Sequence, residues 1–149
     1  MIAYADTSWW VAFKNSGDSQ HEAAVSLWDL SDDISVIWTP WQRVEVFNAI
    51  RQVEKLGFLR AVKSGVVIRA LENEVRLGYW PHVEFAWQDA IRTANELSAG
   101  HSHSLAIRAM DLFHVAIACE TGAEKFLTFD GDQAALADVA GLKVWRGDR

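Results

Sequence analysis

Short apolar runs alternate along this chain with longer segments in which apolar residues recur every three or four positions. The runs are typical of buried strands, and the longer segments are typical of helices that bury one face. The predicted strands lie at 2–6, 35–39, 125–129 and 142–145, with a less regular candidate at 78–85 that Pro81 interrupts. The predicted helices lie at 8–14, 19–31, 40–55, 59–77, 86–98 and 104–122, and a loop with a short helix follows at 130–140.

This alternation predicts an α/β fold in which helices cover both faces of a mostly parallel sheet. The chain has 149 residues, and no repeat, low-complexity tract or linker divides it, so we expect a single domain over 1–149. Folds of this kind bind ligands beyond the carboxyl ends of the strands, where the strand order reverses. We therefore expect a functional site at the carboxyl ends of the predicted strands.

Composition narrows the class of protein. The chain has no run of about 18 apolar residues, so we expect no membrane span. It starts directly with strand-like sequence rather than with the pattern of a secretory signal. The single cysteine, Cys119, lies in an apolar helical run and fits the core of a protein from a reducing compartment. We therefore expect a cytoplasmic protein.

Charge and aromatic content bear on possible partners. The formal net charge is −6 at pH 7, which argues against a basic surface for nucleic acid. An enzyme that contacts phosphates through bound metal ions is still compatible with this charge. The eight tryptophans are many for this length. Tryptophan can stack on bases, but in a small domain most tryptophans belong to the core or to an interface.

Two of the predicted strands end on an aspartate. The run IAYAD ends at Asp6, and the run FLTFDGD carries Asp130 after its apolar residues and Asp132 two positions later. Thr128 shares a strand face with Asp130 because side chains alternate along a strand. If the two strands are neighbours in the sheet, Asp6 and Asp130 open into one crevice. For Asp130 alone, a turn at Asp-Gly is an equally good explanation.

Two further acids lie on predicted helices. Asp111 lies in MDLFHVAIAC, a segment that is apolar on nearly all sides. A lone buried carboxylate is costly there unless it pairs or faces a polar crevice. Arg108 and His114, three positions away on either side, are candidate partners. Glu45 lies at the border of the apolar stripe of the helix at 40–55, which suits either the edge of a cleft or an ordinary surface position.

Convergence of the four acids would demand cations. Carboxylates in close contact repel each other by about 4 kcal/mol per pair at an intermediate dielectric constant. Some of them would then be protonated, or cations would neutralise them. Ligand sets made only of oxygen favour hard ions such as Mg²⁺ or Mn²⁺. A hard ion held by Asp6, Glu45, Asp111 and Asp130 beside a strand crevice indicates phosphoryl chemistry, in which the ion activates a water and stabilises the leaving oxygen.

Several segments resemble the PIN domain family, most closely the VapC-type toxin ribonucleases of bacterial toxin–antitoxin pairs. These segments are ADTSWW at the start of the chain, VEVFNAI around Glu45, AMDLFHVAIA and FLTFDGD. The resemblance covers essentially the whole chain, with one departure at 78–85, where the aromatic stretch GYWPHVEF replaces a plain short strand. It implies a three-layer α/β/α sandwich with strand order 3-2-1-4-5, which places the strands ending at Asp6 and Asp130 side by side.

The resemblance also implies roles for individual residues. The four acids would bind Mg²⁺ or Mn²⁺, with Asp132 as an additional candidate ligand. Hydrogen bonds from Thr7 or Ser8 and from Thr128 would support them, and His114 would pack beside them as further support. The basic residues that are candidates for phosphate contacts are Lys14, Arg43, Arg51 and Arg108.

The function implied by the resemblance is that of a Mg²⁺- or Mn²⁺-dependent endoribonuclease that hydrolyses RNA and is inhibited by a small antitoxin protein. The implied assembly is a homodimer. The apolar helical regions 7–30 and 40–56 are candidate surfaces for the dimer or for the antitoxin. Two alternatives stay open: a PIN-like module that has lost its activity and only binds proteins, and a structure-specific DNA nuclease.

Overall fold

Four strands form one parallel sheet in the centre of the molecule. A computed structural model describes residues 1–29, 33–60 and 62–145 of the chain. The strands are β1 (Ile2–Ala5), β2 (Ser35–Ile37), β3 (Lys125–Leu127) and β4 (Lys143–Trp145), in the order β2-β1-β3-β4. All three neighbouring pairs are parallel. The sequence predicts that Asp6 and Asp130 share a crevice if their strands are neighbours. They are neighbours, because β1 pairs with β3.

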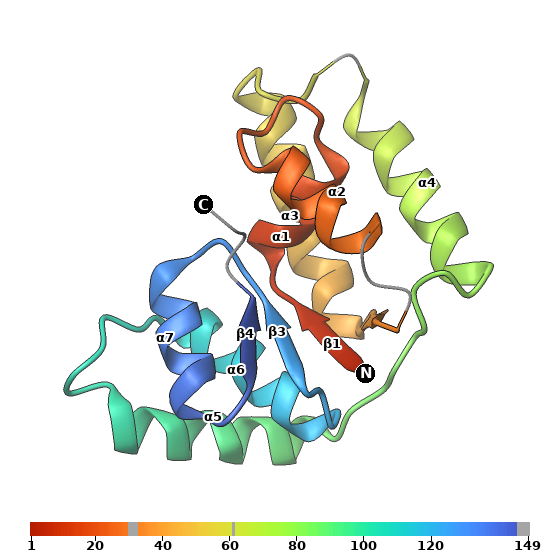
Figure 1. The fold of residues 1–149 in the computed structure, drawn as a ribbon. Coiled ribbons are helices and arrows are strands. Elements are labelled where there is room, and N and C mark those ends of the chain that lie inside the picture. The colour runs from red at the N-terminus through yellow and green to blue at the C-terminus, as the bar shows by residue number, and fades with distance from the viewer. Residues whose placement is uncertain (30–32, 61, 146–149) are drawn as a thin grey trace.

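Helices cover both faces of this sheet. The described residues form α1 (Thr7–Lys14), α2 (His21–Asp29), α3 (Pro40–Lys55), α4 (Ser64–Arg76), α5 (Trp87–His101), α6 (Ala109–Glu120) and α7 (Gly131–Val139). Helices α1–α4 lie on one side of the sheet and α5–α7 lie on the other (Figure 1). The predicted three-layer sandwich is therefore confirmed.

The predicted order 3-2-1-4-5 also agrees with the sheet, except that its outer strand is reduced to a single bridge. His82 pairs in parallel with Trp38, just beyond β2. The Trp38 N–H donates to the Pro81 carbonyl at 2.9 Å, and the Val83 N–H donates to the Trp38 carbonyl at 2.8 Å. Pro81 has no N–H to continue a ladder, so the pairing stays this short.

Two helices begin five residues later than predicted, and the other boundaries of the described helices agree within three residues. Helix α4 begins at Ser64 rather than at 59, because Ser64 donates its N–H and its hydroxyl to the two carboxylate oxygens of Glu54, at 2.9 and 2.7 Å. Helix α6 begins at Ala109 rather than at 104, and the extended backbone of Arg108 (φ −93°, ψ 161°) precedes it. Residues 30 and 31 of the helix predicted at 19–31 lie outside the described residues.

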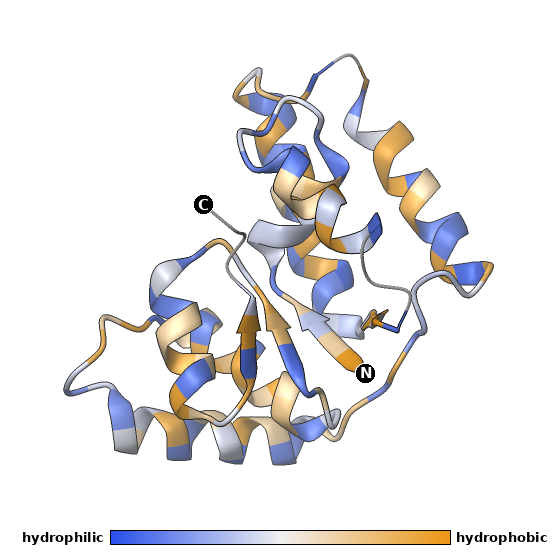
Figure 2. Ribbon diagram, in the orientation of Figure 1, coloured by the Kyte–Doolittle hydropathy of each residue, from blue (hydrophilic) through white to orange (hydrophobic). Residues whose placement is uncertain are grey.

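The alternation of side chains along β1 divides the core into two clusters. Ala3 and Ala5 face the cluster made with α1–α4, and Tyr4 faces the cluster made with α5–α7. All three residues are fully buried. Helices α4 and α5 show polar and apolar residues in alternating bands (Figure 2), the pattern of helices that bury one side and expose the other.

Tryptophan accounts for much of the cluster under α1–α4. Trp9, Trp10 and Trp38 are fully buried. The Trp10 ring meets those of Trp38 and Trp80 nearly at right angles, with centroids 5.1 and 5.0 Å apart. These tryptophans are core residues and are not placed to stack on bases.

None of the helices in the described residues has the length and hydrophobicity of a membrane span.

A buried glutamine fixes α3 to the end of β1. Gln42 is fully buried; its Nε2 donates to the Ala5 carbonyl at 2.6 Å, and its Oε1 accepts from the Thr39 N–H at 2.7 Å. Thr39 is the N-cap of α3 and Pro40 its first residue, as the sequence predicts. Ala5 is next to Asp6, and Gln42 lies one helical turn before Glu45. The contact between Gln42 and Ala5 therefore helps to set the distance between Asp6 and Glu45.

Replacement of Gln42 by leucine should lower the free energy of unfolding by about 3 kcal/mol, because it leaves a buried carbonyl and a buried N–H unpaired at about 1–3 kcal/mol each. Urea denaturation with an unchanged m-value would measure this loss. Gln52→Leu, at an exposed position of the same helix, should change stability by less than about 0.5 kcal/mol. Equal losses in the two variants would show that the Gln42 contacts do not matter.

Candidate functional site

A pocket of about 360 Å³ opens at the carboxyl ends of β1 and β3. All four acids predicted from the sequence line it: Asp6, Glu45, Asp111 and Asp130. They are contributed by four separate segments of the chain, namely the ends of β1 and β3 and the helices α3 and α6. Asp6 is held beside β3 because its backbone N–H donates to the Leu127 carbonyl at 3.1 Å.

Both acids at the strand ends cap the helix that follows. Asp6 is the N-cap of α1 and accepts the Trp9 N–H at 3.0 Å. Asp130 is the N-cap of α7, where its Oδ1 accepts the N–H groups of Asp132 and Gln133 at 2.9 and 3.1 Å. The turn at Asp130 that the sequence left open as an explanation is therefore present, and the carboxylate lines the pocket as well.

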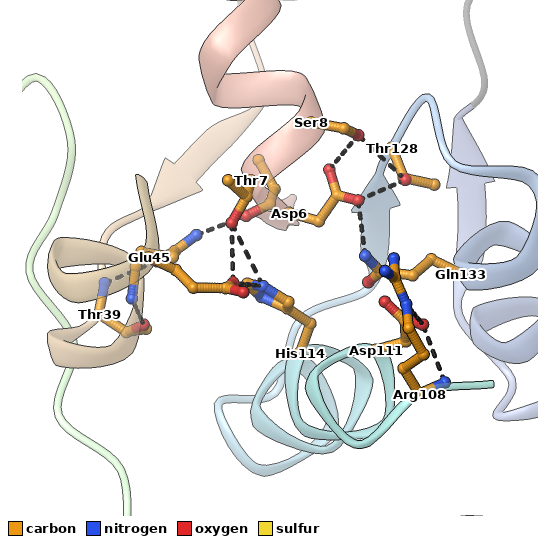
Figure 3. Close-up of polar contacts among 12 residues, drawn as sticks. Asp6, Thr7, Ser8, Thr39, Glu45, Arg108, Asp111, His114, Thr128 and Gln133 are labelled. Atoms are coloured by element: carbon orange, nitrogen blue, oxygen red, sulfur yellow. Dashed lines mark hydrogen bonds and ion pairs between the residues drawn. The ribbon is translucent and has the colours of Figure 1, made fainter. Parts of the chain in front are cut away.

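The Asp6 carboxylate is fully buried and accepts four hydrogen bonds, of which Figure 3 shows those from Ser8, Thr128 and Gln133. Its Oδ1 accepts from the Ser8 hydroxyl at 2.7 Å and from the Trp9 N–H. Its Oδ2 accepts from the Thr128 hydroxyl at 2.6 Å and from the Gln133 amide at 3.0 Å. Ser8 and Thr128 thus contact this acid as the sequence-based assignment expected, and Gln133 was not predicted.

These four donors do not compensate fully for the loss of water. Burial raises the pKa of Asp6 above its ordinary value, although the charge of His114 and the hydrogen bonds from Thr128 and Ser8 act in the opposite direction. The carboxylate is therefore a buried anion in a surrounding of neutral donors. A cation that reached it would gain a strong electrostatic attraction.

Glu45 is held by a chain of polar groups that begins in the core. The Tyr4 hydroxyl lies 2.8 Å from His114 Nδ1, and His114 Nε2 contacts Glu45 Oε2. Burial raises the pKa of Tyr4 well above its usual value, so its hydroxyl keeps the proton. Nε2 faces an ionised carboxylate oxygen, which can only accept, so Nε2 donates to Glu45. The Thr7 hydroxyl donates to the same carboxylate oxygen at 2.8 Å.

The environment of Glu45 lowers its pKa, whereas the environment of Asp6 raises the pKa of that acid. Burial acts to raise the pKa of Glu45, but the hydrogen bond and charge of His114 and the Thr7 hydroxyl outweigh it, and the pKa is lowered. Thr7, predicted as support for the acids in general, therefore supports Glu45. His114, predicted to pack beside the acids, is buried and in direct contact with one of them.

Asp111 lies on a buried helix, as the sequence predicts, but in its first turn, because α6 begins at Ala109 rather than at 104. Its Oδ2 accepts the Arg108 N–H at 3.0 Å, and the Arg108 Nε lies 3.5 Å from the same oxygen. A carboxylate in the first helical turn interacts favourably with the free N–H groups of that end. This local contact makes its burial tolerable, with 5% of the residue exposed.

The remaining predicted residues fall into two groups, those that line the pocket and those that lie outside it. Arg108 lines the pocket, whereas Lys14 pairs with Glu74 and Arg43 pairs with Glu72, both away from it. Arg51 is exposed on α3 and is not among the residues that line the pocket. Asp132, the additional candidate ligand, is also exposed and outside the lining.

Two residues of the site were missed by sequence reasoning. Tyr4 shares a strand face with Asp6, and this alternation in IAYAD was an available signal. Gln133 stands three positions after the helix-capping Asp130, the spacing of a capping box. That signal predicts a contact with the backbone at Asp130, whereas the side chain reaches Asp6 instead.

The chemistry of these donors fits a hard divalent ion. Glu45, Asp111 and Asp130 each use one carboxylate oxygen in the hydrogen bonds above, and the other accepts none from the described residues. Among these residues, however, no three His, Cys, Asp or Glu side chains lie close enough together to hold a metal ion. Glu45 is turned toward His114 and Asp111 toward Arg108, so a shared ion requires these side chains to rotate into the pocket.

Comparison with known proteins agrees with the fold. The model of the PIN domain family matches residues 3–139 of this chain. VapC20 of Mycobacterium tuberculosis, described as a toxin that cleaves the sarcin–ricin loop, superposes with a TM-score of 0.66 at 22% identity, over 89% of this chain and 93% of its own. None of the curated proteins matches by sequence.

Two further similar structures carry the name VapBC. A chain of VapBC2 from Rickettsia felis, bound to a promoter DNA fragment, superposes with a TM-score of 0.68 at 15% identity, over 99% of this chain and 100% of its own. A chain of VapBC-1 from nontypeable Haemophilus influenzae gives 0.64 at 13% identity, over 97% of each chain. At these identities the likeness establishes a shared fold.

The raised pKa of Asp6 predicts a pH-dependent stability difference between the wild type and Asp6→Asn in EDTA. The folded state keeps the Asp6 proton to a higher pH than the unfolded state. The wild type should therefore lose stability relative to the variant as pH rises from about 4 through the folded pKa, and the difference should then level off. Thermal unfolding between pH 4 and 8 would measure this.

Asp138→Asn, at an exposed position of α7, is the matched control and should change stability by less than about 0.5 kcal/mol throughout. A difference between wild type and Asp6→Asn that stays flat or shrinks with rising pH would contradict the burial argument.

Proposed function

This chain belongs to the PIN domain family, and from that premise we propose that it is a Mg²⁺- or Mn²⁺-dependent endoribonuclease and the toxin of a type II toxin–antitoxin pair. The observation that carries the proposal is the pocket itself. It gathers four carboxylates from four segments at the carboxyl ends of adjacent parallel strands. Carboxylate oxygens are the ligands that these hard ions prefer.

In this proposal Asp6, Glu45, Asp111 and Asp130 hold the ion. A bound Mg²⁺ or Mn²⁺ would supply a Lewis acid and lower the pKa of a water for attack on a phosphodiester. The donors around Asp6 fix that carboxylate in place and oppose the rise of its pKa that burial causes, and Thr7 and His114 hold Glu45. From these positions Glu45 and Asp111 would turn into the pocket to share the ion with Asp6 and Asp130.

RNA is the proposed substrate, and the charge of the pocket decides how it can bind. Four carboxylates repel a phosphate unless a cation lies between them. Arg108 is the only lysine or arginine among the described residues that line the pocket, and its side chain is 82% exposed. It can leave Asp111 and pair with a phosphate of the chain at little cost, because exposed ion pairs contribute about 0–1 kcal/mol.

A small antitoxin is the proposed partner, and the VapBC names of two similar structures support it. Of the two regions predicted as partner surfaces, the first buries its tryptophans Trp9 and Trp10 in the core. A second pocket of about 270 Å³ lies at the edge of this region, lined by Phe13, Lys14, Trp28, Glu74, Tyr79 and Trp80. In the second region, exposed Val44 lies on α3 and exposed Leu56 is the residue that caps its end. A homodimer in the cytoplasm completes the proposal, and sedimentation of the purified chain would test the dimer.

The alternatives make different predictions for the same site. A module that only binds proteins has no need for four acids around one pocket, because their repulsion destabilises the fold when no cation is bound. A DNA nuclease would use the same acids and the same ions. The choice between RNA and DNA therefore needs a direct comparison of substrates.

Purified protein free of antitoxin should cleave cellular RNA in Mg²⁺ or Mn²⁺, leave 5′-phosphate ends and lose this activity in EDTA. Asp6→Asn should lower the rate by more than about 100-fold, since loss of even an outer-shell partner of a metal site typically costs 10- to 100-fold. Asp138→Asn should keep the full rate. End-group analysis and a parallel assay on single-stranded and branched DNA provide the measurements.

Cyclic phosphate ends would contradict the metal-dependent route, because they arise from attack by the RNA 2′-hydroxyl. Cleavage of DNA alone would favour the DNA nuclease. Absence of cleavage together with absence of Mn²⁺ binding would favour the inactive module.

A further inference from the structure

Among the described residues that line the pocket, Gln133 is the one side chain with a buried polar atom that has no hydrogen-bond partner. It is 6% exposed, lines the pocket and reaches from α7 toward Asp6 (Figure 3). Its Nε2 donates to Asp6 Oδ2 at 3.0 Å. Its Oε1 is buried and has no hydrogen-bond partner among the described residues. Buried carbonyl oxygens nearly always find a partner, so an orphaned one beside a polar pocket points to a ligand.

The hydrogen bonds of Asp6 show why this oxygen matters. A carboxylate offers about four lone-pair positions, and the four donors described above occupy all of them. An ion can therefore bind Asp6 only if one of the donors gives way. The donor that moves most easily will be the one with the fewest other contacts.

Three of the four donors are held by a second interaction. The Trp9 N–H belongs to the first turn of α1. The Ser8 hydroxyl also accepts the Phe129 N–H at 3.0 Å, and the Thr128 hydroxyl also accepts the Asp130 N–H at 2.9 Å. Gln133 has no such second contact through its amide. Its side chain is long and can turn about its last bond.

We propose that Gln133 is a fifth ligand of the divalent ion, which it binds through Oε1 when its amide turns away from Asp6. The amide carbonyl is a hard oxygen donor of the kind that Mg²⁺ and Mn²⁺ accept. It carries no charge, so it adds a ligand without adding repulsion to four carboxylates. The exchange frees Asp6 Oδ2 and gives the orphaned oxygen a partner in the same movement.

The inference rests on the proposed metal dependence, and Mn²⁺ binding to the metal-free protein tests both separately. Free Mn²⁺ can be counted by electron paramagnetic resonance during a titration of wild type, Gln133→Leu and Gln133→Glu. Gln133→Leu should bind about tenfold more weakly, within the range found for residues that support a metal site. Gln133→Glu keeps an oxygen at this place and should bind at least as tightly as wild type.

Asp138→Asn is the matched control, because Asp138 lies on the same helix as Gln133 but is exposed and outside the pocket lining. It should leave Mn²⁺ affinity unchanged. Circular dichroism of each metal-free variant would establish that it is folded.

Three results would overturn the inference. A Gln133→Leu variant that matches wild type or binds Mn²⁺ more tightly would make Gln133 a clamp on Asp6 and no ligand. Gln133→Glu binding as weakly as Gln133→Leu would lead to the same conclusion and leave the metal dependence intact. Wild type without affinity for Mn²⁺ would overturn this inference and the metal dependence together.

Discussion

One buried carboxylate determines how this molecule is assembled. Asp6 lies at the end of β1, and its four donors come from α1, from the segment after β3 and from α7. A buried anion without such donors would be too costly to keep. The parallel pairing of β1 with β3 and the start of two helices thus meet at a single group. Any rearrangement of these elements would leave that anion unpaired.

Two acids that line the pocket have pKa values shifted in opposite directions. Burial raises the pKa of the fully buried Asp6, whereas the contact with His114 lowers the pKa of the partly buried Glu45. The same side-chain chemistry therefore receives two environments within one pocket. Such separation is how sites assign distinct roles to like groups. The charge of His114 lowers the pKa of both acids, but only Glu45 also contacts His114 directly, and His114 in turn contacts Tyr4 in the core.

The periodic pattern predicted the layers, the parallel sheet and the strand ends that carry acids, because these follow from side-chain alternation and from burial. It placed Asp111 on a helix correctly but began that helix five residues too early, since apolar neighbours do not reveal where the first turn begins. It did not predict the contact of Gln133 with Asp6, which joins positions 127 apart and leaves no periodic trace. The outer strand at 78–85 shortened to one bridge because Pro81 has no N–H. Local sequence patterns therefore predict helices and strands, whereas contacts between polar groups far apart in the sequence become visible only in the structure.

The pairing of the first strand with a late one has a consequence for synthesis. Asp6 and Thr128, which share a hydrogen bond, are 122 positions apart. At roughly 5–20 residues per second, the ribosome needs roughly 6–24 s to add the second partner after the first. Throughout this interval the nascent chain has no complete pocket, since the end of β3 and the start of α7 do not yet exist. The pocket can therefore form only after the ribosome has added the start of α7.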